Sequence, residues 1–277
     1  MDLSTLTTEE QNPRTKNIDK LDTLSMLEII NSEDKKAAIA VEAELTNIFK
    51  AVDLITDKLK KGGRMLYIGA GTSGRLGVLD ASECPPTFGV SPHMIQGVIA
   101  GGPKALMSSI EGAEDNQDRA ITDLKERNLT ANDILVGIAA SGRTPYVVRA
   151  LKYAKLIKAS TIALSCTRNS EIAGLADVAI TPLTGSEVIT GSTRLKAGTA
   201  TKMVLNMLTT ATMIKLGKVR GNLMVDVQAT NEKLKSRAIN IVKTVTNCDD
   251  ETAINALKKS DNSAKAAIDI ILNSNES

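Results

Sequence analysis

Apolar residues at helical spacing dominate the first part of the chain. Between residues 41 and 59, Val, Leu, Ile and Phe recur at intervals of three and four, which predicts one apolar helix face. Ser32 stands where an N-cap belongs, and the two acidic residues after it suit the positive end of a helix dipole. A Gly-Gly pair at 62–63 is typical of a helix end. The pattern therefore predicts a helix that Ser32 caps and that ends near residue 62.

Short apolar runs alternate with helical stretches between about residues 64 and 220. The runs carry almost no charge, as expected for strands that are buried on both faces of a parallel sheet. The five expected strands are residues 64–69, 96–100, 134–139, 161–165 and 178–182. Helical periodicity is clear at 146–157 and 194–216. This alternation predicts an α/β fold, a three-layer α-β-α sandwich with a mostly parallel sheet.

The last part of the chain has no strand pattern and predicts short helices. These helices are expected at residues 231–245, 250–259 and 263–272. Asp250 and Ser263 stand in capping positions. The three patterns together predict a helical extension at 1–60, an α/β domain at 61–220 and a small helical domain at 221–277. For most of the helical domain we expect packing or subunit pairing rather than chemistry.

Composition argues against nucleic acid and membranes as partners. Aromatic residues make up 2% of the chain and Trp is absent, so stacking platforms for bases are lacking. The 34 Lys+Arg are nearly balanced by 32 Asp+Glu, and no basic stripe stands out. The chain has neither a run of about 18 apolar residues nor a basic-then-apolar signal pattern at its start. We therefore expect a cytoplasmic protein.

The cysteines and the single histidine predict neither a disulfide framework nor a metal site. Cys84, Cys166 and Cys248 lie far apart and are odd in number, which suits a reducing compartment. His93 belongs to none of the familiar ligand spacings. We therefore expect no metal site.

Two of the predicted strands end in loops suited to a phosphate. Residues 69–75 and residues 137–144 each run from an apolar strand into Gly, Ser and Thr before a helix. Glycines let the backbone approach a ligand, and the free N–H groups at a helix start point to an anion. In open α/β sheets, ligands bind at the carboxyl ends of the strands. The pair of loops predicts a phosphate site, although either loop alone is also compatible with an ordinary βα turn.

The glycines at 69, 71 and 74 match the dinucleotide-binding fingerprint, which by itself is a weak signal. A nucleotide site favours an acidic residue at the end of the second strand, for the ribose. Asp80 and Glu83 come too early, and the second strand ends at 100–102 without a carboxylate. The pattern therefore favours a phosphate ester over a dinucleotide.

A third polar segment, residues 190–198, opens the helix predicted from residue 194. It is either a helix cap with two solvated cations or the completion of an anion pocket. In the second case the contributing residues are Ser192, Thr193, Arg194 and Lys196.

At these loops the sequence resembles a known superfamily. Residues 139–144 have the form Ser/Ala-x-Ser-Gly-x-Thr of the sugar isomerase (SIS) phosphosugar-binding domains. More narrowly, the chain resembles the N-acetylmuramic acid 6-phosphate etherases. The matching stretches are residues 6–10, 12–15, 69–77, 80–88, 111–115, 141–146, 191–198 and 221–227. Residues 167–169 depart from the Asn-Pro-Gly associated with the family.

The resemblance implies a lyase that needs no cofactor and acts in cell-wall sugar catabolism. Its reaction is cleavage of a lactyl ether at C3 by water, giving N-acetylglucosamine 6-phosphate and D-lactate. Ring opening exposes an aldehyde, a base removes the C2 proton, an acid protonates the departing lactate oxygen, and water adds at C3. By resemblance Glu83 is the acid and Glu114 is the base. We expect Glu83 in a stiff loop beside Cys84 and two prolines, and Glu114 at a helix end.

The resemblance also guides the binding residues and the partners. The assigned phosphate ligands are Thr72, Ser73, Ser141, Gly142 and Thr144, with Ser192 as a further substrate contact. Arg75 and Arg143 either contact the phosphate or form structural ion pairs, and we favour the ion pairs. Partners implied are the phosphosugar and a second copy of the chain, which helps to close the pocket in a homodimer.

Two other functions are compatible with the same fold. The glucokinase regulatory protein resembles this family and binds phosphosugars without turnover, but it has two such domains in tandem where this chain has one copy of each loop. An aldose–ketose phosphate isomerase needs one base near C1 and C2 and no acid at C3. A ketose product without lactate identifies the isomerase, and binding without product identifies the regulator.

Overall fold

The computed structural model describes residues 9–226 and 232–275. The parts of the family-like stretches at residues 6–8 and at residue 227 lie outside the described residues. The chain divides into two compact units. One consists of Met1–Ala81 and His93–Thr210, and the other of Ser82–Pro92 and Ala211–Ser277.

Five strands form one parallel sheet in the first unit. The strands are β1 (Met65–Gly69), β2 (Ile95–Ile99), β3 (Ile134–Ile138), β4 (Ser160–Leu164) and β5 (Val178–Ile180). Their order is β2-β1-β3-β4-β5, and each neighbouring pair is parallel. Every residue of β1 and β3 is buried, which explains why these strands are apolar throughout. The predicted sheet and sandwich are confirmed, with strand ends shifted by at most two residues.

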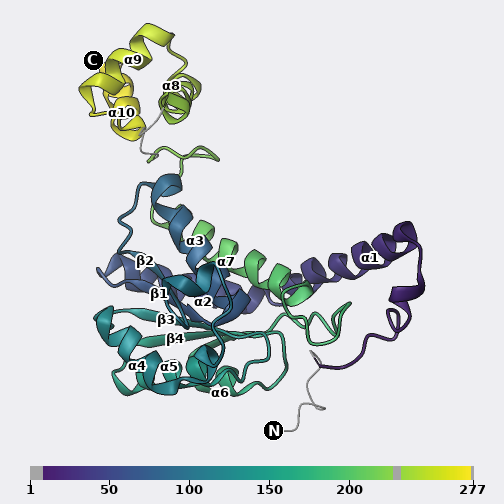
Figure 1. Cartoon of the computed structure of the whole chain (residues 1–277). Coiled ribbons are helices and arrows are strands. Elements are labelled where there is room, and N and C mark those ends of the chain that lie inside the picture. Colours follow the sequence, from purple (N-terminus) through teal and green to yellow (C-terminus); the bar gives the residue numbers. More distant parts are fainter. Residues whose placement is uncertain (1–8, 227–231, 276–277) are drawn as a thin grey trace. The chain divides into compact units, whose positions relative to one another are not determined.

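Helices cover both faces of this sheet (Figure 1). The helices of the first unit are α1 (Thr23–Glu42), α2 (Leu45–Lys60), α4 (Gln117–Glu126), α5 (Pro145–Leu156) and α6 (Glu171–Leu175), with short 3-10 turns η1 (Ile18–Lys20), η2 (Pro103–Leu106) and η3 (Ala113–Asp115). Two further helices, α3 (Gly71–Phe88) and α7 (Lys196–Lys215), begin in the first unit and end in the second. The core beneath α4 and α5 joins side chains such as Leu66, Leu124, Leu135 and Leu151.

The predicted start of the N-terminal helix is wrong. Asp22 is the N-cap, and its carboxylate accepts from the N–H groups of Leu24 and Ser25. Ser32 lies inside α1, and a break after Glu42 separates α1 from α2. Asp22 lies ten residues before Ser32, and its carboxylate accepts from two N–H groups that have no acceptor within the helix. The helix therefore begins at Asp22.

The predicted loop around Glu83 is also wrong. Glu83, Pro85 and Pro86 all lie within α3, which continues to Phe88. Proline has a helical φ but donates no N–H, so the last turns of α3 lack two backbone hydrogen bonds without ending there. The helix stops only at Gly89, whose φ of +63° is left-handed.

The second unit has a separate core formed by three C-terminal helices. These are α8 (Glu232–Thr246), α9 (Asp250–Lys259) and α10 (Ala264–Asn275), as predicted within three residues. Their apolar faces meet around Val242, Leu257 and Ile268. Ser263 accepts from the N–H of Ala266, as a cap does, whereas the cap of α9 is Asp249 rather than Asp250. Within the described residues, none of the helices combines the length and apolar content that a membrane span requires.

Candidate active site

The two predicted phosphate loops lie side by side because β1 and β3 are neighbours in the sheet. Both loops leave the carboxyl ends of these strands and face one cavity of about 270 Å³. The lining consists of Glu9, Ala70, Gly71, Thr72, Ser73, Glu114, Ala139, Ala140, Ser141, Thr144, Gly191, Thr193, Gly198 and Thr201. The structure thus gathers hydroxyl groups from separate parts of the chain; this cavity is called the hydroxyl cavity below.

Local structure leaves donors free to face the hydroxyl cavity. The first turn of α3 contains Gly71, Thr72 and Ser73, and backbone N–H groups in a first turn have no acceptor within their own helix. Thr144 occupies the N-cap position of α5, yet its hydroxyl makes no capping hydrogen bond. Among the described residues of the lining, none is lysine or arginine. An anion in this cavity would therefore be held by hydroxyl and amide groups.

Two of the assigned ligands do not line the hydroxyl cavity. Gly142 has a φ of +68°, and a Cβ there would lie 2.1 Å from the Cβ of Ser170. Its conformation makes the turn that presents Ser141. Ser192 is also absent from the lining, although its neighbours Gly191 and Thr193 belong to it. Their binding roles stay predictions.

Glu114 lies at the boundary between two cavities. It belongs to the short turn η3, which follows Gly112 in a left-handed conformation with φ +70°. Its side chain is on the lining of the hydroxyl cavity and of a neighbouring cavity of about 310 Å³. The two cavities also share Ala70 and Gly71. A proton acceptor at this point would reach a ligand that extends from one cavity into the other.

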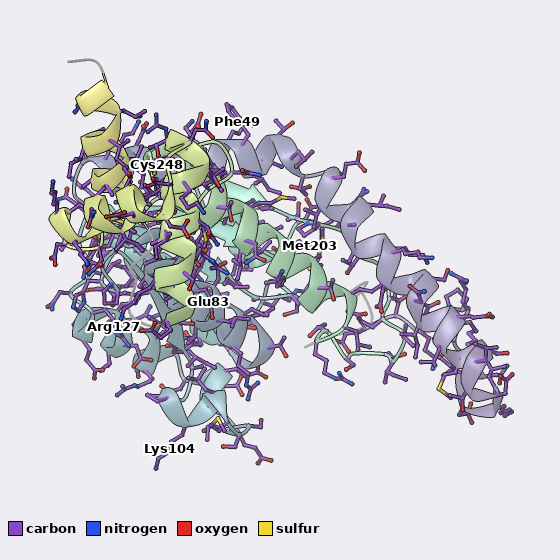
Figure 2. The ribbon with its side chains drawn as sticks, turned by 90° about the horizontal axis from the view of Figure 1, so that it is seen from above. Phe49, Glu83, Lys104, Arg127, Met203 and Cys248 are labelled. Carbon is purple, nitrogen blue, oxygen red and sulfur yellow. The ribbon has the colours of Figure 1, made fainter. Side chains whose placement is uncertain are left out.

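Glu83 belongs to the second unit and lines neither of these cavities. Figure 2 labels its side chain on α3. Its assignment as the acid stays a prediction.

Glu9 is a lining residue for which the sequence predicted no role. An added Cβ on Gly191 would lie 3.0 Å from its Oε2 atom, so the carboxylate lies directly against this glycine. Two carboxylates, Glu9 and Glu114, therefore face a cavity that has no basic residue among the described ones on its lining. Like charges repel, so these two carboxylates disfavour an anion directly beside them.

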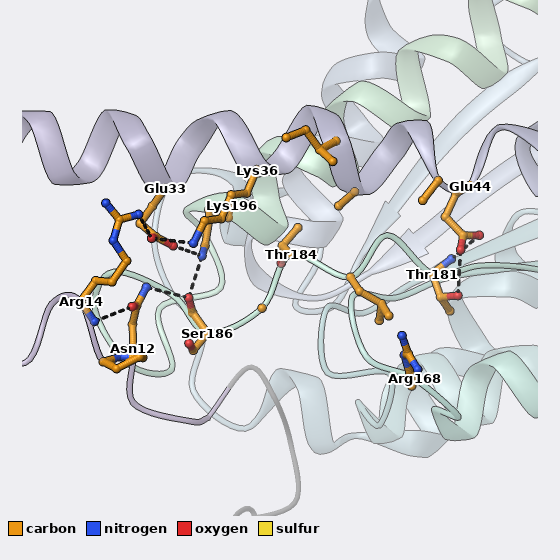
Figure 3. A pocket seen from close by; sticks show the side chains of 16 residues that line it. Asn12, Arg14, Glu33, Lys36, Glu44, Arg168, Thr181, Thr184, Ser186 and Lys196 are labelled. Carbon is orange, nitrogen blue, oxygen red and sulfur yellow. Dashed lines mark hydrogen bonds and ion pairs between the residues drawn. The ribbon is translucent and has the colours of Figure 1, made fainter.

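Lys196 was one of the residues that could complete the predicted anion pocket. It is instead buried in an ion pair. Its Nζ donates to Glu33 Oε2 at 2.6 Å and to the Ser186 carbonyl at 2.7 Å, and the side chains of Lys196 and Glu33 are 1% and 0% exposed. Figure 3 shows this cluster, where Arg14 and Lys36 also donate to Glu33. Burial by itself raises the pKa of Glu33, but hydrogen bonds from Lys196, Lys36 and Asn12 and the charge of Lys196 lower it to about 2.

The same cluster ties the N-terminal segment to the loop before α7. Asn12 Nδ2 donates to the Ser186 carbonyl, and the Thr15 hydroxyl donates to the Val188 carbonyl at 2.9 Å. The buried Glu187 accepts from the N–H groups of Lys196 and Ala197 and so caps α7. These contacts fix the segment that carries Glu9 against the segment that carries Gly191 and Thr193.

Family models match most of the chain. The N-terminal SIS domain of the glucokinase regulatory protein matches residues 47–155, the SIS domain matches 118–211, and the C-terminal lid domain of the glucokinase regulatory protein matches 221–275. An N-acetylmuramic acid 6-phosphate etherase of Clostridium beijerinckii is 57% identical, with 98% of this chain and 90% of the relative covered. One of Actinobacillus pleuropneumoniae is 55% identical over 99% of this chain and 90% of its own length. The chain belongs to the N-acetylmuramic acid 6-phosphate etherase family.

Solved structures agree with the fold expected of an etherase family member. A phosphoheptose isomerase from Neisseria gonorrhoeae superposes with a TM-score of 0.52 at 20% identity, over 72% of this chain and 100% of that chain. A phosphoheptose isomerase from Francisella tularensis gives a TM-score of 0.50 at 16% identity, over 69% of this chain and 98% of that chain. At these identities the likeness concerns the sandwich alone. It places the etherase chain among proteins with the SIS fold.

Proposed function

We propose that this chain cleaves the lactyl ether of N-acetylmuramic acid 6-phosphate with water and releases N-acetylglucosamine 6-phosphate and D-lactate, as a carbon–oxygen lyase of cell-wall sugar catabolism. Identity of 55–57% to etherases over nearly the whole chain supports the substrate. The observation that carries the proposal is the hydroxyl cavity, which combines phosphate-binding loops with the carboxylate of Glu114.

The phosphate is bound at the loop ends and the sugar extends toward Glu114. Hydroxyls of Thr72, Ser73, Ser141 and Thr144, with the N–H groups at the start of α3, donate to the phosphate oxygens. Binding of the phosphate holds the rest of the substrate in a fixed orientation. The reacting carbons then meet the acid and the base as if all were parts of one molecule, which lowers the entropic cost of the reaction.

Glu114 removes the C2 proton after ring opening, and Glu83 protonates the lactate oxygen as the C3–O bond breaks. Water then adds to C3 of the unsaturated aldehyde, so the hydroxyl of the product comes from solvent. Each proton transfer of this kind accelerates a reaction by roughly 10²- to 10⁴-fold.

Solvent oxygen gives the sharpest test of this function. In ¹⁸O-water the purified chain is expected to convert N-acetylmuramic acid 6-phosphate to sugar labelled at the C3 hydroxyl and to unlabelled D-lactate, because elimination breaks the sugar-side C–O bond. Mass spectrometry of both products measures the label. Labelled lactate would contradict the mechanism, and a ketose without lactate would identify an isomerase.

A phosphosugar-binding regulator is the second candidate, because models of both the SIS domain and the lid domain of the glucokinase regulatory protein match this chain. The first model matches at 47–155 and the second at 221–275. Calorimetric titration that finds phosphosugar binding, together with no lactate after prolonged incubation, would favour this candidate.

The chain is further proposed to act as a homodimer, with residues 61–220 as its catalytic domain, 1–60 as an N-terminal extension and 221–277 as a C-terminal domain. Apolar side chains on α1 and α2 support the pairing because they are exposed: Leu24, Leu27, Ile39, Leu45 and Phe49. Phe49, labelled in Figure 2, is 62% exposed. We propose that these side chains form the apolar surface through which two copies of the chain associate.

Phe49→Asp is expected to convert the dimer to a monomer, because a charge buried in an apolar interface is costly. Light scattering measures the mass. Leu156→Asp is the matched control. Leu156 is an exposed apolar residue too, with 78% of its surface accessible, but it belongs to α5 and not to α1 or α2. Wild-type chain that is monomeric at micromolar concentration would disprove the dimer.

A further inference from the structure

The cavity beside the hydroxyl cavity has a different chemistry. Its volume is about 310 Å³, and its lining includes Arg75, Ser108, Ser109 and Glu111 besides the shared Ala70, Gly71 and Glu114. Arg75 is the basic residue among the described ones on this lining, whereas the hydroxyl cavity has none. Ligand pockets have volumes of roughly 300–1,000 Å³, so the hydroxyl cavity, at about 270 Å³, is below this range and its neighbour, at about 310 Å³, is at the lower end. A ligand that spans both is therefore expected.

Arg75 is held in place without being neutralised. Its Nε donates to the Leu106 carbonyl and its Nη2 to the Ser108 carbonyl, both at 3.2 Å. A guanidinium has five N–H donors, so three are left. Among the described residues no carboxylate lies within ion-pair distance of Arg75, in contrast to the ion pair favoured from the sequence. The side chain is thus a fixed cation with donors left for a ligand.

The proposed substrate has two anionic groups, the 6-phosphate and the carboxylate of the lactyl ether on C3. The loops after β1 and β3 bind the phosphate in the proposed function, but they include no partner for the carboxylate of the lactyl group. Glu114 lies on both linings and is proposed to act at C2, the carbon next to the ether. A sugar with its phosphate in the hydroxyl cavity and C2 at Glu114 therefore directs its C3 substituent toward the second cavity.

We propose that Arg75, together with the hydroxyl of Ser109, forms a subsite for the lactyl carboxylate; the proposal rests on the etherase function above. An arginine fork matches a carboxylate in shape and charge. The bound carboxylate also meets Glu111 and Glu114 on the same lining, and the positive charge of Arg75 offsets their repulsion. Arg75 is then a specificity residue that distinguishes the substrate from the product sugar, which has the phosphate but no lactyl group.

The test compares substrate, neutral substrate and product. Arg75→Gln is expected to raise the KM for N-acetylmuramic acid 6-phosphate by roughly 10- to 100-fold, as for loss of a charge-assisted hydrogen bond. The inhibition constant of N-acetylglucosamine 6-phosphate is expected to stay within about twofold, because that sugar never reaches the subsite. The methyl ester of the lactyl group should be a poor substrate for wild type and no poorer for the variant, since the two changes remove the same interaction.

Two further variants separate recognition from folding. Arg75→Lys keeps a charge but loses the fork, and we expect an intermediate KM. Arg149→Gln is the matched control, because Arg149 is an exposed arginine on α5 that lines neither cavity. An equal loss of substrate and product binding in Arg75→Gln would overturn the subsite and indicate a purely structural role. Absence of lactate from wild-type chain would instead disprove the etherase function itself.

Discussion

Glu114→Gln is expected to abolish both lactate release and the exchange of the substrate C2 proton with solvent. Glutamine has nearly the same shape but cannot accept a proton, so turnover should fall by about 10²- to 10⁴-fold or more. Binding of N-acetylglucosamine 6-phosphate should be retained, because the phosphate loops are unchanged. Lactate is measured enzymatically, and exchange by NMR in deuterated water.

Glu83→Gln is the matched variant that separates base from acid. If Glu83 protonates the departing lactate oxygen, this variant loses lactate release but still exchanges the C2 proton, because removal of that proton comes first. Exchange that survives in Glu114→Gln, or wild-type turnover in either variant, would contradict the assigned roles. Comparison of the two variants thus shows which proton transfer comes first.

Much of the sheet could be predicted because its strands are short, mostly apolar runs without a charged residue. Strands buried on both faces need no alternation, so residues 134–139 and their counterparts are distinct from the amphipathic helices around them. The loops after β1 and β3 could be predicted for the same reason, since strand ends locate them. The sequence therefore predicts which residues lie at the carboxyl edge of the sheet.

The errors arose where a local signal competed with another element. Ser32 has the chemistry of a cap, but Asp22 is an equally good cap ten residues earlier, and Ser32 instead accepts from Arg14. Pro85 and Pro86 usually end a helix, yet α3 continues through them. Such choices depend on packing that a single sequence does not contain.

Long-range pairs lay beyond sequence reasoning. Glu33 and Lys196 are 163 positions apart, and each looks like an ordinary charged residue of a helix. Glu9 reaches the hydroxyl cavity only because the N-terminal segment is tied to the loop before α7. The buried ion pair and the place of Glu9 on the cavity lining could therefore emerge only from the fold.

Lys196→Met is expected to lower the free energy of unfolding by about 3–5 kcal/mol, because a buried carboxylate then loses the one charged partner that is itself buried among the described residues. Lys36→Met is the matched control. Lys36 donates to the same carboxylate but is 47% exposed, so its loss should cost less than about 1 kcal/mol. Urea denaturation measures both, and equal losses would show that the buried pair has no special role.

The pH dependence of stability should follow the same carboxylate. The pKa of Glu33 is about 2 in the folded chain, below its ordinary value of 4.5, so the folded state binds this proton less readily than the unfolded state does. Its contribution is therefore complete above about pH 4.5 and is lost as the pH falls toward 2. Glu33→Gln removes this titration, and its stability should fall less steeply over that interval than that of wild type. An unchanged slope would mean that Glu33 titrates normally, and the ion pair with Lys196 would then add nothing to the stability of the folded chain.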